Sequence, residues 1–83
     1  MKVVLNRDAQ EQFDALPPSV QVRIFGLLER LTAWPLVSGV RRLRGRLAGH
    51  WRIRTGDYRV QFRIEENRVV VVKVGHRDRF DED

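Results

Sequence analysis

The stretch WRIRTGDYRVQFRI, residues 51–64, decides the fold, because large apolar residues alternate with arginine on both sides of a Thr-Gly-Asp turn. Alternation with a period of two is typical of a half-buried β-strand, and a glycine-containing turn between two such runs favours a hairpin. One face of the hairpin holds Trp51, Ile53, Tyr58, Val60, Phe62 and Ile64. The other face holds Arg52, Arg54, Arg59 and Arg63. The first face predicts a hydrophobic core, whereas four like charges on the second face need a different explanation.

Two helices are predicted ahead of the hairpin. Residues 1–5 are a strand candidate, and Asn6 or Asp8 is expected to cap a first helix that the following proline pair ends. Ser19 is expected to cap a second helix, which Pro35 ends. Apolar residues recur at helical spacing in both segments, at Ala9, Phe13 and Leu16 and then at Val20, Ile24, Leu27, Leu28 and Leu31. The two helices are therefore expected to form a hairpin with one apolar side.

Three strands are predicted in the second half, at His50–Arg54, Tyr58–Glu65 and Arg68–Gly75. They follow a connection over residues 36–51, which reads as a loop with room for a short strand or turn. The valine-rich last strand favours a central position in the sheet. The order β-α-α-β-β-β predicts an α+β fold, in which the helical hairpin packs on one face of a small, mainly antiparallel sheet.

The length and composition restrict the number of domains and the kinds of site that the chain can form. A chain of 83 residues with 42% hydrophobic residues can build one modest core, so a single domain over residues 1–83 is expected. The chain has no cysteine and only two histidines, so neither a metal site nor a cofactor is expected. No apolar run approaches the length of a membrane span, and the absence of cysteine fits a reducing compartment. A cytoplasmic protein without a membrane partner is therefore expected.

The charge is concentrated in one part of the chain. The sixteen Lys and Arg residues include only two lysines, which leaves fourteen arginines, and the net charge is +5. Residues 41–63 contain eight of these arginines and a single acid, Asp57, which could hold an arginine in place. Arginine presents a planar fork of donors suited to phosphate and carboxylate, and it stays charged wherever it lies. The arginine-rich segment therefore predicts a polyanion or an acidic protein as partner.

Extending the alternation into the last strand adds two more cations to the arginine side. The pattern predicts that Lys73 lies on the side of Val69 and Val71, and that Arg77 follows the strand with the same parity. As many as six cations would then line one face of the sheet, which the chain itself is expected to leave uncovered. Cations placed together without an anion repel each other, so this arrangement is typical of a binding site.

The run LRGRLAGHWRIRTGDYRVQFRIEENRVVVVKVGHRDRF, residues 43–80, resembles the C-terminal half of the RelE/ParE toxin superfamily. The shared features are Leu-x-Gly, then Arg-Ile-Arg-x-Gly-Asp-Tyr-Arg-Val, then a valine-rich strand that ends in Val-Gly-His-Arg. The preceding helical hairpin is similar in length and order. The resemblance implies a toxin of a type II toxin–antitoxin pair, neutralised by a cognate antitoxin. For RelE-like members it implies a ribosome-dependent, metal-independent mRNA interferase that drives the 2′-hydroxyl onto the adjacent phosphate.

The resemblance also implies roles for individual residues. Basic residues occupy the family's functional positions at Arg52, Arg54, Arg59 and Arg77. Arg59 and Arg77 would clamp the scissile phosphate, while Arg52 and Arg54 would orient the backbone and act on the 2′-oxygen. Contact with the RNA backbone is expected from the remaining basic residues, Arg41, Arg42, Arg44, Arg46, Arg63 and Lys73. For Arg41, Arg42, Arg44 and Arg46 the alternative is a solvated loop.

Two departures from the RelE-like pattern leave alternatives open. An arginine stands where a lysine is common, and many members carry a tyrosine or histidine near the C-terminus, where this chain ends Arg79-Phe80-Asp81-Glu82-Asp83. Either His76 replaces that group, or catalysis is purely electrostatic, or the chain is an inactive toxin-like binding module. A structural role is favoured for His76. A ParE-like inhibitor of DNA gyrase is the other function that the superfamily offers.

Overall fold

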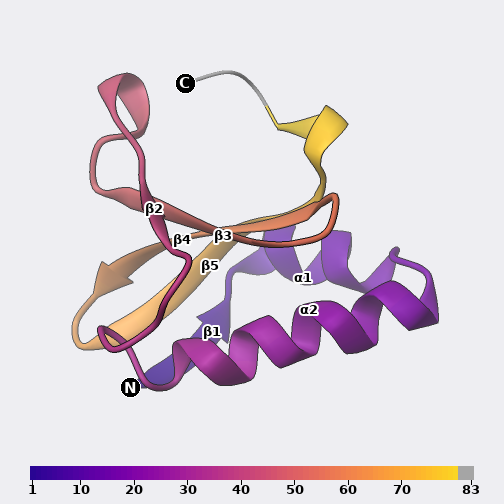
Figure 1. Ribbon diagram of the computed structural model, residues 1–83, viewed down its shortest axis with the longest axis horizontal. Helices are drawn as coiled ribbons and strands as arrows, with labels where there is room; N and C mark the ends of the chain where they lie inside the picture. The colour runs from indigo at the N-terminus through magenta and orange to yellow at the C-terminus, as the bar shows by residue number, and fades with distance from the viewer. Residues whose placement is uncertain (81–83) are drawn as a thin grey trace.

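The computed structural model describes residues 1–80 and consists of a mixed sheet with two helices on one face (Figure 1). The strands are β1 (Lys2–Leu5), β2 (Arg41–Arg42), β3 (His50–Thr55), β4 (Tyr58–Glu65) and β5 (Arg68–His76). The helices are α1 (Arg7–Asp14) and α2 (Pro18–Leu31), and two 3₁₀ turns follow at η1 (Gly45–Leu47) and η2 (Arg77–Arg79). The predicted α+β fold, its helical hairpin and its order of elements are confirmed.

The sheet has the strand order β1-β5-β4-β3-β2. Strand β1 runs parallel to β5, and the other neighbouring pairs are antiparallel. The valine-rich β5 therefore lies between β1 and β4, as predicted for a strand of that composition. Figure 1 shows α1 and α2 on one side of the sheet, while η1 and η2 stand on the other side.

The two helices begin in different ways. In α1 the side chain of Asn6 accepts a hydrogen bond from the backbone N–H of Ala9 at 2.9 Å, so the predicted cap is confirmed and Asp8 lies inside the first turn. In α2 the expectation of a Ser19 cap is wrong. That helix begins at Pro18, and no side chain caps it. Proline suits this position because its φ is preset and it has no N–H to satisfy.

The core lies between the helices and the apolar face of the hairpin. The largest fully buried side chains are Phe62, Ile24, Leu31, Ile53, Val60, Val69 and Val71. Trp34 follows α2 and covers the edge of this core, with its ring centroid 5.0 Å from that of Trp51 and 5.3 Å from that of Phe62, both edge-on. The periodicities of the helices and of the hairpin therefore identified the core correctly.

A helix side chain continues the hydrogen bonding of β5 where β1 stops. The ladder between β1 and β5 ends with Leu5 opposite Val71, and the N–H of Asn6 still donates to the carbonyl of Val71. Three residues further along β5, the N–H of Val74 donates to the side-chain oxygen of Gln12 on α1 at 2.8 Å. Gln12 thus satisfies a backbone donor that would otherwise lack a partner at this edge of the strand.

An irregularity in β5 decides on which face Lys73 lies. Gln61 pairs with Lys73, but the next residue of β4, Phe62, pairs with Val71, so β5 contains one extra residue at this point. Such a bulge reverses the alternation along the strand. Val69 and Val71 face the core, whereas Lys73 faces the opposite side. The prediction that Lys73 shares a face with these valines is wrong, although Lys73 does reach the arginine side.

Candidate functional site

The arginines of the opening stretch meet on the sheet face that lies away from the helices. Arg54 on β3 pairs directly with Arg59 on β4, and Arg52 pairs with Gln61 one step further along. Arg41 on β2 pairs with Arg52, and Lys73 on β5 pairs with Gln61 from the other side. Directly paired residues of neighbouring strands point to the same face. We call the set Arg41, Arg52, Arg54, Arg59 and Lys73 the basic surface.

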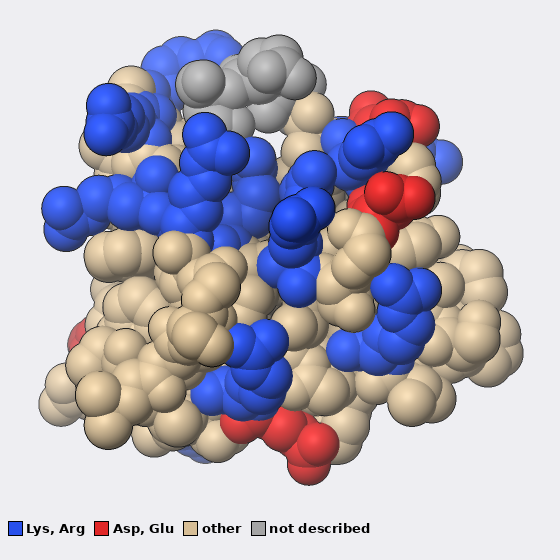
Figure 2. Space-filling view, viewed as in Figure 1, with Lys and Arg blue, Asp and Glu red and all other residues tan. Residues whose placement is uncertain are grey.

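The basic surface contains two arginines, Arg54 and Arg59, that face each other directly across neighbouring strands. In the space-filling view, Lys and Arg side chains gather over the part of the molecule that holds β2, η1 and η2, whereas the part that holds α2 is mostly neutral (Figure 2). Among residues 1–80, no carboxylate forms an ion pair with Arg54 or Arg59. Like charges directly opposite each other destabilise a sheet. Such a pair is therefore better explained by an anion that binds there than by the stability of the free protein.

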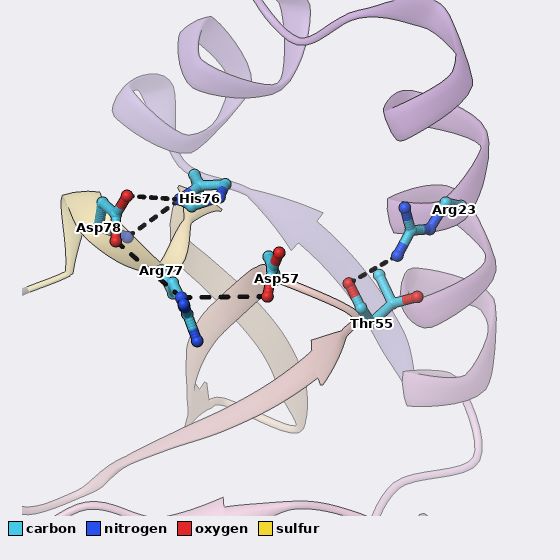
Figure 3. Close-up of polar contacts among 6 residues, drawn as sticks. All are labelled: Arg23, Thr55, Asp57, His76, Arg77 and Asp78. Atoms are coloured by element: carbon cyan, nitrogen blue, oxygen red, sulfur yellow. Dashed lines mark hydrogen bonds and ion pairs between the residues drawn. The ribbon is translucent and has the colours of Figure 1, made fainter.

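Arg77 continues the same face beyond the end of β5. Its backbone N–H donates to the carbonyl of Asp57 at 2.7 Å, which extends the register of β4 and β5 into the turn before β4. The Nε atom of Arg77 lies 3.9 Å from a carboxylate oxygen of Asp57 and 4.0 Å from one of Asp78 (Figure 3). These pairs are exposed and at the limit of contact, so they orient the guanidinium weakly and leave it available to an anion. The expectation that Asp57 could hold an arginine is therefore met only by this weak contact.

The β3–β4 turn that carries Asp57 is itself held by α2. The Nη2 atom of Arg23 donates to the backbone carbonyl of Thr55 at 3.0 Å (Figure 3). Gly56 follows with a φ of 59°, and a Cβ at this position would collide with the same guanidinium. A side chain of the helical layer thus fixes the turn that joins the strands of Arg54 and Arg59. This contact could not be predicted from the sequence, because Arg23 lies in an ordinary amphipathic helix.

The structure does not bring His76 to the basic surface. His76 pairs with Tyr58, whose ring it meets edge-on with centroids 5.3 Å apart, so both lie on the side of the helices. Its Nδ1 atom accepts a hydrogen bond from the N–H of Asp78 at 3.2 Å and helps to begin η2 (Figure 3). The arrangement fits the structural role that the sequence favoured, since residues of this parity point away from Arg59.

The other basic residues predicted to touch RNA divide into three groups. Arg42 pairs with Trp51 and lies 5.0 Å from the centroid of its ring, so it belongs to the opposite face of the sheet. Arg63 shares the face of Arg59, but its Nε atom lies 3.5 Å from a carboxylate oxygen of Glu65. Arg44 and Arg46 are exposed at η1, beside the basic surface. Only part of the predicted set is thus brought together.

Within residues 1–80, Phe80 covers the middle of the basic surface, so the expectation that the chain leaves this face uncovered is wrong. After η2, Phe80 is only 9% exposed, although it is not part of the main core. The Cζ atom of Arg52 lies 5.0 Å from the centroid of its ring, and the Nζ atom of Lys73 lies 4.5 Å from it. The only signal in the sequence was one aromatic residue in an otherwise charged tail. The acidic residues 81–83 lie outside the described residues.

The basic surface presents hydrogen-bond donors that carry positive charge, and such groups bind a phosphate diester. Within residues 1–80 there is no group of three or more histidine, cysteine, aspartate or glutamate side chains that could hold a metal ion. Neither helix in that part of the chain has the length and apolar character that a membrane span needs.

A comparison with known protein families gives a match over most of the chain. The sequence profile described as "ParE toxin of type II toxin-antitoxin system, parDE" matches residues 3–79. No curated protein matches the chain in sequence.

Several solved structures of toxins and of toxin–antitoxin complexes have the same fold. The toxin–antitoxin complex RelBE2 from Mycobacterium tuberculosis contains a chain with 29% identity and a TM-score of 0.80, with 90% of this chain and 95% of that chain covered. The archaeal RelE-RelB complex from Pyrococcus horikoshii shows 23% identity and a TM-score of 0.75, covering 95% and 97% of the chains. The isolated RelE toxin of E. coli shows 19% identity and a TM-score of 0.76, covering 90% and 82%. The last two likenesses concern the fold alone.

Proposed function

Because this chain belongs to the ParE toxin family of type II toxin–antitoxin systems, within the RelE/ParE superfamily, we propose that it is a ribosome-dependent mRNA interferase. One observation carries the proposal: Arg54 and Arg59 lie directly opposite each other on the sheet face away from the helices, with Arg52 on the same strand as Arg54 and with Arg77 following β5 opposite Asp57. Several guanidinium groups around one point are suited to holding a phosphate and to stabilising the charge that develops on it.

The proposed reaction is an internal transesterification of RNA. The 2′-oxygen forms a bond to the adjacent phosphorus, and the bond from phosphorus to the 5′-oxygen breaks. The 2′-hydroxyl loses a proton and the departing 5′-oxygen gains one, which leaves a 2′,3′-cyclic phosphate and a 5′-hydroxyl. Additional negative charge develops on the phosphate oxygens in the transition state. Fixed cations placed around that charge are usually the largest source of rate acceleration.

The residues of this chain would contribute mainly electrostatics. Arg59 and Arg77 would hold the phosphate oxygens, and Arg52 and Arg54 would position the neighbouring backbone and stabilise the 2′-oxygen as it loses its proton. A guanidinium stays protonated near neutral pH and does not accept that proton itself. His76 lies on the other side of the sheet, so we assign it no part in the proton transfer.

We further propose that a cognate antitoxin neutralises the protein by laying an acidic segment across the basic surface. The relative from Mycobacterium tuberculosis is a toxin–antitoxin complex, and the positive charge of the surface favours an acidic partner. Co-expression with the product of the neighbouring gene should restore growth to cells that this chain inhibits. An unrelated acidic protein at the same level should not.

The test of the proposed activity is primer extension on mRNA from translating ribosomes incubated with the purified protein. The wild type should produce new ends within the A-site codon. Arg54→Ala and Arg59→Ala should each slow cleavage about 100-fold, since each removes a donor to the developing charge.

Arg7→Ala is the matched control. It removes the same charge from α1, where the side chain is 90% exposed and pairs with Glu11, and it should change the rate by less than about twofold because surface ion pairs contribute little. Intact mRNA with the wild type, or unchanged cleavage by both basic-surface variants, would contradict the proposal.

A second candidate is inhibition of DNA gyrase, and two observations favour it: the ParE description of the matching family, and Phe80 near the C-terminus where nuclease members often carry a tyrosine. A supercoiling assay separates the two candidates. The interferase proposal expects unchanged gyrase activity. Loss of supercoiling with accumulation of cleaved DNA, while mRNA stays intact, would replace it by the alternative.

A further inference from the structure

Phe80 occupies a place on the sheet that the charge pattern would assign to solvent. The chain leaves β5 through η2, where the N–H of Phe80 donates to the carbonyl of Arg77 at 3.1 Å. This turn directs the ring back over the sheet, so that Phe80 becomes 9% exposed while Arg77 and Arg79 beside it remain exposed. An apolar ring is thus buried among cations rather than in the main core.

The ring lies between two cations that come from non-adjacent strands. Arg52 on β3 and Lys73 on β5 both pair with Gln61 on β4, which is itself only 6% exposed. One strand, β4, lies between them, so two inter-strand spacings separate these residues by about 10 Å at the backbone. The centroid of the Phe80 ring lies 5.0 Å from Cζ of Arg52 and 4.5 Å from Nζ of Lys73. Both distances are within the range of cation–π attraction.

Gly75 provides the room that this arrangement needs. The Cε1 atom of Phe80 lies 3.8 Å from the position that a Cβ of Gly75 would occupy. Gly75 pairs with Arg59, so the ring rests beside the proposed phosphate position as well as between the two cations. A larger side chain at Gly75 would lift the ring away from the sheet, which links the small residue to the placement of the aromatic one.

We infer that Phe80 is a positioning residue, which holds Arg52 and Lys73 in preset places beside Gln61 so that a phosphate diester meets them already oriented. The inference rests on the proposed function only in taking RNA as the ligand. Long cationic side chains lose rotational freedom when they bind, and a ring that already restrains them reduces this loss. The ring has no acidic or basic group, so it acts through the two cations.

Two measurements on Phe80→Leu test the inference, because leucine keeps an apolar side chain but has no π face. The first needs no RNA: in the wild type, ring-current effects should shift the side-chain proton resonances of Lys73 upfield, and Phe80→Leu should abolish the shift. The second is the affinity for a short 2′-O-methyl RNA, which cannot be cleaved, measured by fluorescence anisotropy. Phe80→Leu should weaken binding about five- to tenfold, as expected from two lost cation–π contacts.

Two further variants complete the design. Phe80→Tyr keeps the aromatic face and should bind the RNA within about twofold of the wild type, while Phe25→Leu removes an exposed ring from α2 and should also leave binding unchanged. Unshifted Lys73 resonances in the wild type, or equal RNA affinity for Phe80→Leu and Phe80→Tyr, would overturn the inference. If the RNA binds and responds to Phe80→Leu but mRNA on ribosomes stays intact, the interferase proposal fails and the positioning role stands.

Discussion

At the scale of single residues, the basic surface depends on contacts that lie outside it. Gly56 adopts a φ of 59°, a conformation in which a Cβ is strained, and it lies directly against the guanidinium of Arg23. Arg23 also binds the carbonyl of Thr55. A side chain of α2 therefore holds the turn that places Arg54 opposite Arg59. A substitution at this turn should lower the free energy of unfolding.

Gly56→Ala should destabilise the protein by about 2 kcal/mol, about half from backbone strain and about half from the lost hydrogen bond of Arg23. Urea unfolding measures the loss. In an Arg23→Ala background the same substitution should cost only about 1 kcal/mol, because only the strain remains. Gly75→Ala is the matched control: its Cβ would meet Phe80 in ordinary van der Waals contact, so the stability should stay the same or rise slightly. Equal losses at the two glycines would contradict this explanation.

Single residues also show where prediction from sequence succeeds and fails. Alternation with a period of two placed Arg52, Arg54 and Arg59 on one face, because each strand of a hairpin carries its own local pattern. Phe80 could not be placed in the same way. Its position depends on the pairing of β3, β4 and β5, which brings Arg52 and Lys73 together from separate parts of the sequence.

At the scale of elements, β5 contributes side chains both to the core and to the basic surface. It pairs with β1 on one side and with β4 on the other, and its bulge turns Val69 and Val71 to the core and Lys73 to the basic surface. A run of valines predicts a buried strand, but the bulge results from pairing with β4. The face on which Lys73 lies could therefore be predicted only from the register between β4 and β5.

The edge of β5 beyond β1 yields a prediction about Gln12. Gln12→Ala leaves the N–H of Val74 without its partner, so the protein should lose about 1–2 kcal/mol of stability, and this amide should exchange with solvent faster in hydrogen-exchange measurements. Gln10→Ala is the control, since Gln10 lies on the same helix and binds only the exposed Asp14. Unchanged protection of Val74 in Gln12→Ala would show that the glutamine contact does not stabilise the edge.

At the scale of the whole molecule, the two faces of the sheet differ in what they contact. The helices bury one side in the core, and the other side holds Arg41 of β2 together with basic residues of β3, β4 and β5, with η1 and η2 beside it (Figures 1 and 2). The layer order could be predicted, because amphipathic helices require an apolar partner. The partial cover by Phe80 and the place of Arg42 beside Trp51 could not, since they depend on the path of η2 and on the pairing of β2 with β3.

The most direct measurement is an NMR titration that follows the Nε–Hε resonances of individual arginines as a 2′-O-methyl RNA is added at low salt. A phosphate held between guanidinium groups should shift the resonances of Arg54 and Arg59 together, with one affinity, while the resonance of Arg7 on α1 stays in place. The affinity should fall as salt rises, because the contacts release counterions. Resonances that move first on the helical side, with Arg54 and Arg59 unchanged at saturation, would contradict the account.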